Sequence, residues 1–383
     1  MTTREIAMGL AHARPFDSWV ITPVHESGRS AVTWNETASM PLILENLRRH
    51  AEIASVGRQR FSGSLAQKNT LWLEYRNFMR QALSNFQAAM SVPNRSSCLL
   101  YYYAMLNFAK AELLTVRPVD VQGAVHHGLS FSPGRQGKSI AGDSPTVRKG
   151  VFPWLYEHRT GHPLPIGTKL PIKRLVPQIP QVGSQSFDMG WGEERPRGFH
   201  HVVVTDSRQS WPVMLLHEDD LPTGITAKLL NRHFERVVKC DNWRDVFAIS
   251  RRVVNFSAYQ ARKTAPRLPD GSPDMDGALD LTWQMKDILA PRDIAFHEGT
   301  LCPSLYDSRL FPMPPSLARY AVTYYASSLV RYKPSVFDSQ LFPEQALLFD
   351  AIARECALPM LLDTFSALEG DAQLFVDGST LRV

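Results

Sequence analysis

The chain has 383 residues, of which 44% are hydrophobic and 21% are charged, and its mean hydropathy is -0.20. This balance is typical of a folded soluble protein with a sizeable core and argues against a disordered chain. A net charge of +5 and a pI near 9.0 favour anionic partners without requiring them.

Three helices are predicted in the first third of the chain. The first covers residues 41–54, where leucines recur at near-helical spacing. The second covers residues 64–90 and ends before Pro93, because a proline breaks a helix. The third covers residues 94–114, with Asn94 as the expected cap and little room for a solvated face. We expect these helices to pack as a bundle with the third near its centre.

The middle of the chain is predicted to be a mixed α+β region. From about residue 119 to 222 glycine and proline are frequent and periodicity is weak, which is typical of loops that carry function or wrap another element. Two short strands at 200–207 and 211–217, separated by turn-forming residues, predict a hairpin. Helical periodicity resumes at 226–239, and residues 251–260 are expected to form another strand.

The last quarter of the chain is predicted to be helical again. One helix covers residues 316–332 and stops at Lys333, because a proline follows. A single helix is expected over residues 343–368. The predicted fold class is therefore mainly α, a helical bundle with an α+β insertion that contains a short β-hairpin. The expected parts are an N-terminal extension (1–34), an N-terminal helical region (35–118), a loop-rich α+β insertion (119–300) and C-terminal helices that pack on the N-terminal ones (301–383).

The cysteines and the apolar runs limit metal binding and location. The four cysteines are scattered, with no CxxC pair and no Cys/His zinc spacing, so we expect reduced thiols and no metal. Residues 1–19 interrupt every apolar run before it reaches the length of a signal-peptide core. No apolar stretch approaches the roughly 20 residues that span a bilayer. We therefore expect a cytoplasmic protein with no membrane partner and no cofactor.

Four segments support a resemblance to a known family. They are YYYAMLNFAKAELL (101–114), HHGL (126–129), KGVFPWL (149–155) and YYASSLVRYKPSVF (324–337). In this order they resemble the YaaC-like family of bacterial proteins, over most of the chain from about residue 64 to 365. The helical portion is similar to HEPN-type helical domains, many of which are RNases or nucleotide-binding partners in toxin and antiphage systems. The resemblance implies a helical fold and this range of functions, but it does not specify a reaction.

HEPN-type RNases use an arginine and a histidine that follows it after four to six residues. The cation stabilises the phosphorane while the imidazole moves protons. Arg292 and His297 have this spacing, and so do Arg195 and His200. The polar Asp293 follows Arg292, so Arg292 and His297 are the candidate catalytic pair of a metal-independent RNase. The alternative interpretation is a loop ion pair or a capped histidine.

Polar residues in and after the third predicted helix are candidate ligand-binding groups. Asn107 and Lys110 lie one helical turn apart, so both could project into one pocket. His127 is a third candidate, and with the other two it would form the site of a small-molecule sensor. Polar groups on an apolar helix need partners, and these are structural as readily as they are ligands.

Two further segments suggest anion binding. Residues 132–139 nearly match a phosphate-binding P-loop, but Ser132 replaces the first glycine and no helix is predicted after the segment. A basic loop is therefore the preferred interpretation. Arg331 and Lys333 end the helix predicted over 316–332, where cations suit the helix terminus electrostatically and would equally suit a phosphate.

Two interpretations of function remain open at this point. The first is a cytosolic protein that binds or cleaves RNA, or binds a nucleotide, in stress or antiphage defence. The second is a non-catalytic interaction or regulatory subunit, in which the tyrosine-rich helices dock a partner protein or form a homodimer. In that case the loop region 120–225 would supply specificity.

Overall fold

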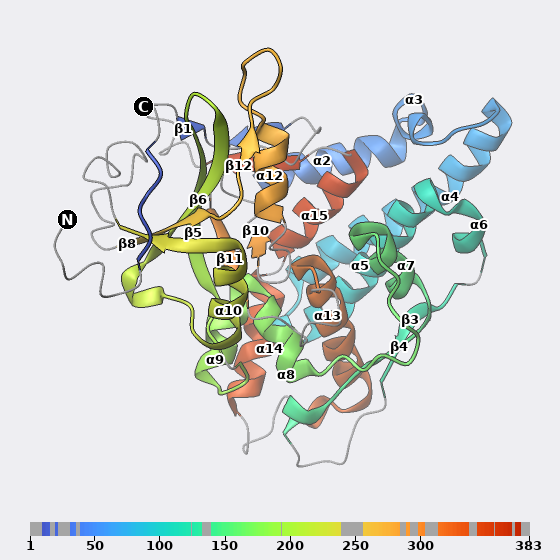
Figure 1. The fold of residues 1–383 in the computed structure, drawn as a ribbon. Helices are drawn as coiled ribbons and strands as arrows, with labels where there is room; N and C mark the ends of the chain where they lie inside the picture. Colours follow the sequence, from blue (N-terminus) through green and yellow to red (C-terminus); the bar gives the residue numbers. More distant parts are fainter. Residues whose placement is uncertain are drawn as a thin grey trace. The chain divides into compact units, whose positions relative to one another are not determined.

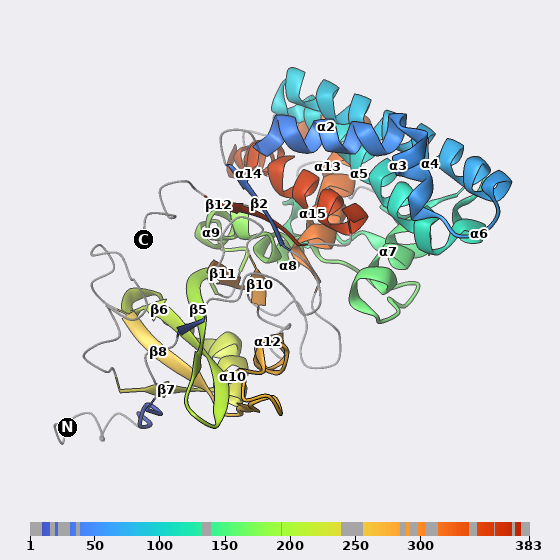
Figure 2. The same ribbon diagram turned by 90° about the horizontal axis from the view of Figure 1, so that it is seen from above.

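The structure is a computed structural model in which two compact units are described separately. Unit 1 comprises Met1–Glu36, Glu193–Pro312 and Asp371–Val383, and unit 2 comprises Thr37–Gly192 and Met313–Gly370. Their elements are labelled in Figures 1 and 2. The residues that the structure describes are 10–15, 20–21, 31–35, 39–123, 125–131, 139–192, 194–238, 256–283, 289–291, 298–302, 313–336, 343–355, 357–369 and 372–376.

Unit 2 is mainly helical, and one helix lies at its centre. Helix α5 contacts α4, α7, α13, α14 and α15, which confirms the central position predicted for the third helix (Figure 2). The longer helices are α2 (Ser39–Glu52), α4 (Leu65–Ser91), α5 (Asn94–Val116), α13 (Pro315–Tyr332), α14 (Pro343–Glu355) and α15 (Ala357–Glu369). The shorter ones are α3 (Ala54–Gly57), α6 (Pro118–Val121), α7 (Val151–Thr160), α8 (Ile172–Leu175) and α9 (Pro180–Asp188).

The starts of α4 and α5 differ in how they are capped. Ser64 and Gln67 form a capping box at α4, in which each side chain accepts from the other's backbone N–H. The prediction that Asn94 caps α5 is wrong. Pro93 takes the cap position, and Asn94 is the first helical residue, whose carbonyl accepts from the Ser97 hydroxyl at 2.6 Å. Pro93 has no side-chain acceptor, and no side-chain cap hydrogen bond is made at this end of α5.

The helix predicted over 343–368 is described in two parts. Helix α14 covers Pro343–Glu355 and α15 covers Ala357–Glu369. The residue between them, 356, lies outside the described residues, so the continuity of this helix stays a prediction.

A short hairpin in unit 2 was not predicted by the sequence patterns. Strands β3 (His127–Ser130) and β4 (Thr146–Gly150) pair antiparallel, with His127 opposite Gly150. Gly128 and Gly150 have φ of +84° and +143°. A Cβ on Gly128 would lie 2.6 Å from Pro153 Cδ, and one on Gly150 would overlap the carbonyl oxygen of His126. The hairpin therefore requires glycine at both positions.

Unit 1 is built around an antiparallel sheet. Its strand order is β10-β11-β5-β6-β8-β7, with β1 also paired to β5 and β9 to β6. The predicted hairpin is confirmed, because β5 pairs antiparallel with β6. The elements of unit 1 are β1 (Val20–Ile21), β2 (Ala31–Asn35), β5 (Arg197–Thr205), β6 (Gln209–His217), α10 (Gly224–His233), β7 (Phe234–Val237), β8 (Phe256–Ala261), β9 (Ala265–Pro266), α12 (Met275–Trp283), β10 (Leu289–Pro291), β11 (Glu298–Leu301) and β12 (Ala372–Val376).

The helix predicted over 226–239 is wrong in its second half. Helix α10 ends at His233 and the chain continues directly as β7, which pairs with β8. Phe234 and Val237 are buried in the same apolar cluster as Trp211 of β6. Sheet pairing and this burial outweigh the helical periodicity of the segment, since propensity is a weak prior against tertiary packing.

Together the two units have a mainly helical fold with a β-sheet region, as the coarse fold class predicted. The sheet pairs antiparallel, whereas β2 and β12 pair in parallel as a separate two-stranded sheet. Among the residues that the structure describes, no helix is long and apolar enough to cross a membrane.

Candidate functional site

Three segments of unit 2 that are far apart in sequence meet at a set of aromatic rings. The ring centres of Tyr102 on α5 and Tyr324 on α13 are 5.3 Å apart, and His127 of β3 lies 5.1 Å from Tyr324. The Tyr324 hydroxyl donates to the carbonyl of Leu129 at 3.3 Å, which ties α13 to the hairpin. Both tyrosines are buried and His127 is half-buried, so the histidine has the greatest access to water.

Two cations lie on the same helices as these tyrosines. Lys110 follows Tyr103 by about two turns on α5, and Arg331 follows Tyr324 by about two turns on α13. Burial lowers the pKa of His127 below its usual range, and the positive charges of Arg331, His126 and Lys110 lower it further. The charges of Lys110 and Arg331 thus both act on His127, which packs against Tyr102 and Tyr324. We call Lys110, His127 and Arg331, with Tyr102, Tyr103 and Tyr324, the cation–tyrosine cluster.

Neither cation of this cluster is paired with a carboxylate in the described part of the chain. The Lys110 ammonium lies 5.4 Å from the centre of the Phe78 ring, and burial lowers the pKa of Lys110. Arg331 Nε donates to the carbonyl of Ser327 at 3.3 Å, and its guanidinium lies over Tyr332 at 5.2 Å. Lys110 is half-buried and Arg331 is exposed, and positive charge without a carboxylate partner favours an anion.

His127 is arranged as a hydrogen-bond donor. The backbone N–H of Leu129 donates to His127 Nδ1 at 3.3 Å. Because the pKa of His127 is lowered, the ring is neutral near pH 7, and its one proton is then on Nε2. Nε2 can therefore donate to a ligand oxygen, whereas a general base would need a free Nε2 lone pair.

The segments that carry the family resemblance supply this cluster. Tyr102 and Lys110 belong to the first segment, His127 to the second and Arg331 to the fourth. The model of the family described as YaaC-like Protein matches residues 62–346, which is more than half of the chain. The chain belongs to the YaaC-like family. The matched region contains the whole cation–tyrosine cluster of this YaaC-like protein. No curated protein and no solved structure matches the chain.

Two other predicted ligand-binding residues of the YaaC-like chain have structural partners. Asn107 is 7% exposed, and its side-chain amide donates to the carbonyl of Tyr103 at 2.9 Å, within its own helix. The charge of Lys333 acts on Asp143, whose carboxylate accepts from the Tyr325 hydroxyl at 2.6 Å. Burial raises the pKa of Asp143, while this hydrogen bond and the Lys333 charge lower it.

The predicted catalytic pair, Arg292 and His297, lies outside the described residues, as does the P-loop-like segment 132–138. Of the second pair with the same spacing, Arg195 is exposed ahead of β5 and His200 lies within β5. Among the residues that the structure describes, no group of three or more His, Cys, Asp or Glu is placed to hold a metal ion.

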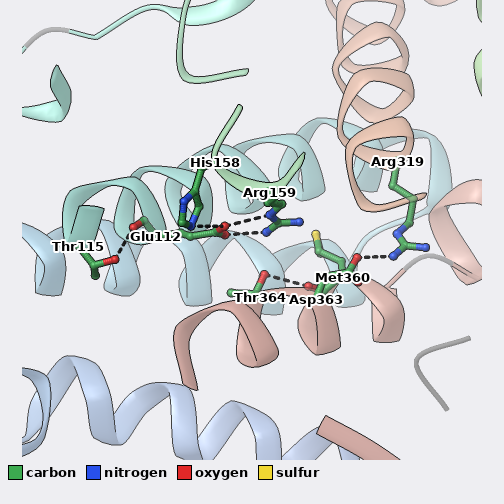
Figure 3. Close-up of polar contacts among 8 residues, drawn as sticks. All are labelled: Glu112, Thr115, His158, Arg159, Arg319, Met360, Asp363 and Thr364. Carbon is green, nitrogen blue, oxygen red and sulfur yellow. Dashed lines mark hydrogen bonds and ion pairs between the residues drawn. The ribbon is translucent and has the colours of Figure 1, made fainter. Parts of the chain in front are cut away.

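A second polar cluster, in the interior of unit 2, was missed by sequence reasoning (Figure 3). Arg159 of α7 donates to both carboxylate oxygens of Glu112 on α5, at 2.9 and 2.6 Å. Arg319 of α13 is paired with Asp363 of α15. Arg319 stands among apolar residues of a predicted helix, and this pattern could have indicated a buried partner.

The space between these two ion pairs is too small for a substrate. A cavity of about 30 Å³ is lined by Arg159, Arg319, Tyr320 and Asp363 among others. A water needs roughly 10–15 Å³ on this measure, so the cavity has room for about two. Each arginine is neutralised by its carboxylate, so an anion gains little there. The cation–tyrosine cluster is therefore the better candidate site.

Proposed function

We propose that unit 2 binds the phosphate groups of RNA or of a nucleotide at the cation–tyrosine cluster. The observation that carries this proposal is that His127 packs against Tyr102 and Tyr324 while the charges of Lys110 and Arg331 act on it, with no carboxylate among the described residues to compensate the two cations. A phosphate would accept from all three groups. Charge-assisted hydrogen bonds of this kind are roughly twice as strong as neutral ones.

Exposed tyrosines beside the cations suit the bases of such a ligand. Tyr103 is 36% exposed and its ring centre lies 5.4 Å from that of Tyr102. Tyr332 is 65% exposed and lies under the Arg331 guanidinium. Unpaired bases stack on aromatic rings, each stack contributing about 1–3 kcal/mol. The resemblance of the helices to HEPN-type domains also supports RNA or a nucleotide, and it suggests stress or antiphage defence as the setting.

Binding without cleavage at this cluster is the form of the proposal that the geometry favours. The hydrogen bond from Leu129 N–H occupies the one lone pair of neutral His127, so the ring offers a donor and no base. Cleavage by Arg292 and His297 would be a separate activity. A protein-interaction subunit is the alternative, and it requires no affinity for either phosphate ligand.

The test is fluorescence anisotropy with a labelled single-stranded RNA and a labelled nucleoside triphosphate. The variants are Lys110→Met and Arg331→Gln, and the control is Arg49→Gln, which removes an exposed cation from α2. A hydrogen bond to a charged group contributes about 1.5–3 kcal/mol, so each variant is expected to weaken binding by about ten-fold or more. The control should bind as the parent does. Absence of binding to both ligands, or parental affinity in both variants, would refute the proposal.

A further inference from the structure

Exposed basic residues continue from the cluster along the hairpin of unit 2. His126 directly precedes β3, and Arg148 and Lys149 lie in β4, which pairs with β3. All three are exposed, and residues 125–131 and 146–150 contain no aspartate or glutamate. The hairpin is therefore a basic surface next to His127.

The hairpin extends the positive surface beyond the reach of one phosphate. Lys149 precedes Gly150, the residue opposite His127, so it lies at the cluster end of the hairpin. Arg148 Nε donates to the hydroxyl of Ser130 at 2.9 Å, which directs its guanidinium toward the other end. At the usual rise per residue, His127 and Ser130 are about 10 Å apart along the strand. A mononucleotide held by the cluster would leave these cations unused.

We propose that the ligand of unit 2 is a single-stranded polynucleotide, whose phosphates pass from the cation–tyrosine cluster onto the β3–β4 hairpin. This inference rests on the proposed function and narrows its substrate class. The two exposed tyrosines, Tyr103 and Tyr332, come from different helices and offer stacking surfaces for separate bases. Bases in a duplex are stacked on one another, so such surfaces select unpaired strands.

The experiment measures affinity as a function of ligand length. Uridine 5′-monophosphate and oligouridylates of increasing length compete with a labelled RNA, and oligothymidylate and a duplex RNA form two further arms. Affinity should rise at least ten-fold from the monophosphate to the longer oligouridylates, and the duplex should bind more weakly. The thymidylate arm decides between RNA and DNA as the source of the strand.

Variants of the hairpin separate this inference from the proposed function. Lys149→Gln and Arg148→Gln/Lys149→Gln should lose the gain with length and keep the affinity for the monophosphate. The matched control is Arg48→Gln/Arg49→Gln, two adjacent exposed cations on α2. Each lost phosphate contact should reduce the slope of log affinity against log salt by about 0.7. Lys149→Gln keeps the Arg148–Ser130 hydrogen bond, and a melting curve verifies that the variants are folded.

The outcomes distinguish the two proposals. If the monophosphate binds as tightly as the oligomers, or if the duplex binds as well as the single strand, the polynucleotide inference is overturned and the proposed function stands. If the hairpin variants bind oligomers with parental affinity, the hairpin has no such role and the inference fails in the same way. If no phosphate ligand binds at all, the proposed function fails with it.

Discussion

The ion pair between Arg319 and Asp363 predicts an asymmetric response to mutation (Figure 3). The Arg319 side chain is 1% exposed, whereas that of Asp363 is 16% exposed. Asp363→Leu would leave the guanidinium buried without its carboxylate. Arg319→Met would leave a carboxylate that still reaches water. The first substitution should therefore destabilise unit 2 more than the second.

The magnitudes follow from the energetics of buried charge. Removing one partner of a buried pair so that the other charge is uncompensated costs about 3–5 kcal/mol, which we expect for Asp363→Leu. For Arg319→Met we expect about 1–2 kcal/mol, because water can solvate the remaining carboxylate. The double variant should lie within about 1 kcal/mol of the parent, since apolar replacement of a whole buried pair is often neutral. Each kcal/mol shifts the melting midpoint by roughly 2–4 °C in a unit of this size.

Urea unfolding and thermal melting of the full chain, followed by circular dichroism, measure these differences. An exposed pair provides the control: Glu52 accepts from Arg80 at 2.6 and 2.5 Å, but both side chains are well solvated. Glu52→Gln should leave the midpoint unchanged within error. The reasoning would be refuted if the double variant lost as much stability as the two single variants together.

Three smaller predictions concern other parts of unit 2. The pKa of His127 is lowered on folding, so the unfolded chain binds the proton first and stability falls as pH drops below about 6.5. His127→Gln should make that fall shallower in urea titrations at successive pH values. Gly150→Ala should destabilise unit 2 by more than about 3 kcal/mol in the same assay, because backbone strain at positive φ adds to the overlap of the new Cβ with the His126 carbonyl oxygen. Gly161→Ala should cost about 1 kcal/mol, because Gly161 has φ of +72° but open space around it. Tyr325→Phe removes a hydrogen bond to Asp143 and should lower the free energy of unfolding by about 1.5–3 kcal/mol in the same assay. Tyr102→Phe should be near neutral, because the Tyr102 hydroxyl has no partner among the described residues.

The helices of unit 2 were predictable where the sequence marks their ends. Ser64 and Pro93 bound one long periodic run, and Pro334 ends another, so α4 and α13 have nearly the predicted limits. The error at α10 arose where a local signal had two meanings. Phe234 suits a helix or a strand until β8 is available to pair with it.

The sequence predicts the members of the candidate site, but their arrangement depends on tertiary structure. Lys110 is predicted as a polar group on an apolar helix, Arg331 as a cation at a helix end that would suit a phosphate, and His127 as a third group of a small-molecule site. What brings them together is the packing of α5 against α13 and the antiparallel pairing of β3 with β4. Gly128 and Gly150 permit that pairing through positive φ, a requirement that a single sequence does not reveal.

The position of Glu112 explains why Lys110 is left for a ligand. Glu112 follows Lys110 by two residues on α5, and residues two apart on a helix face different sides. Its carboxylate is therefore directed to Arg159 of α7, where it makes two hydrogen bonds. Within the described residues, the buried guanidiniums of Arg159 and Arg319 both have carboxylate partners, whereas the half-buried ammonium of Lys110 has only an aromatic ring. Partial burial of an ammonium without an anion is unfavourable, and a bound phosphate would compensate it. The same helix thus supports the fold on one side and the proposed binding site on the other.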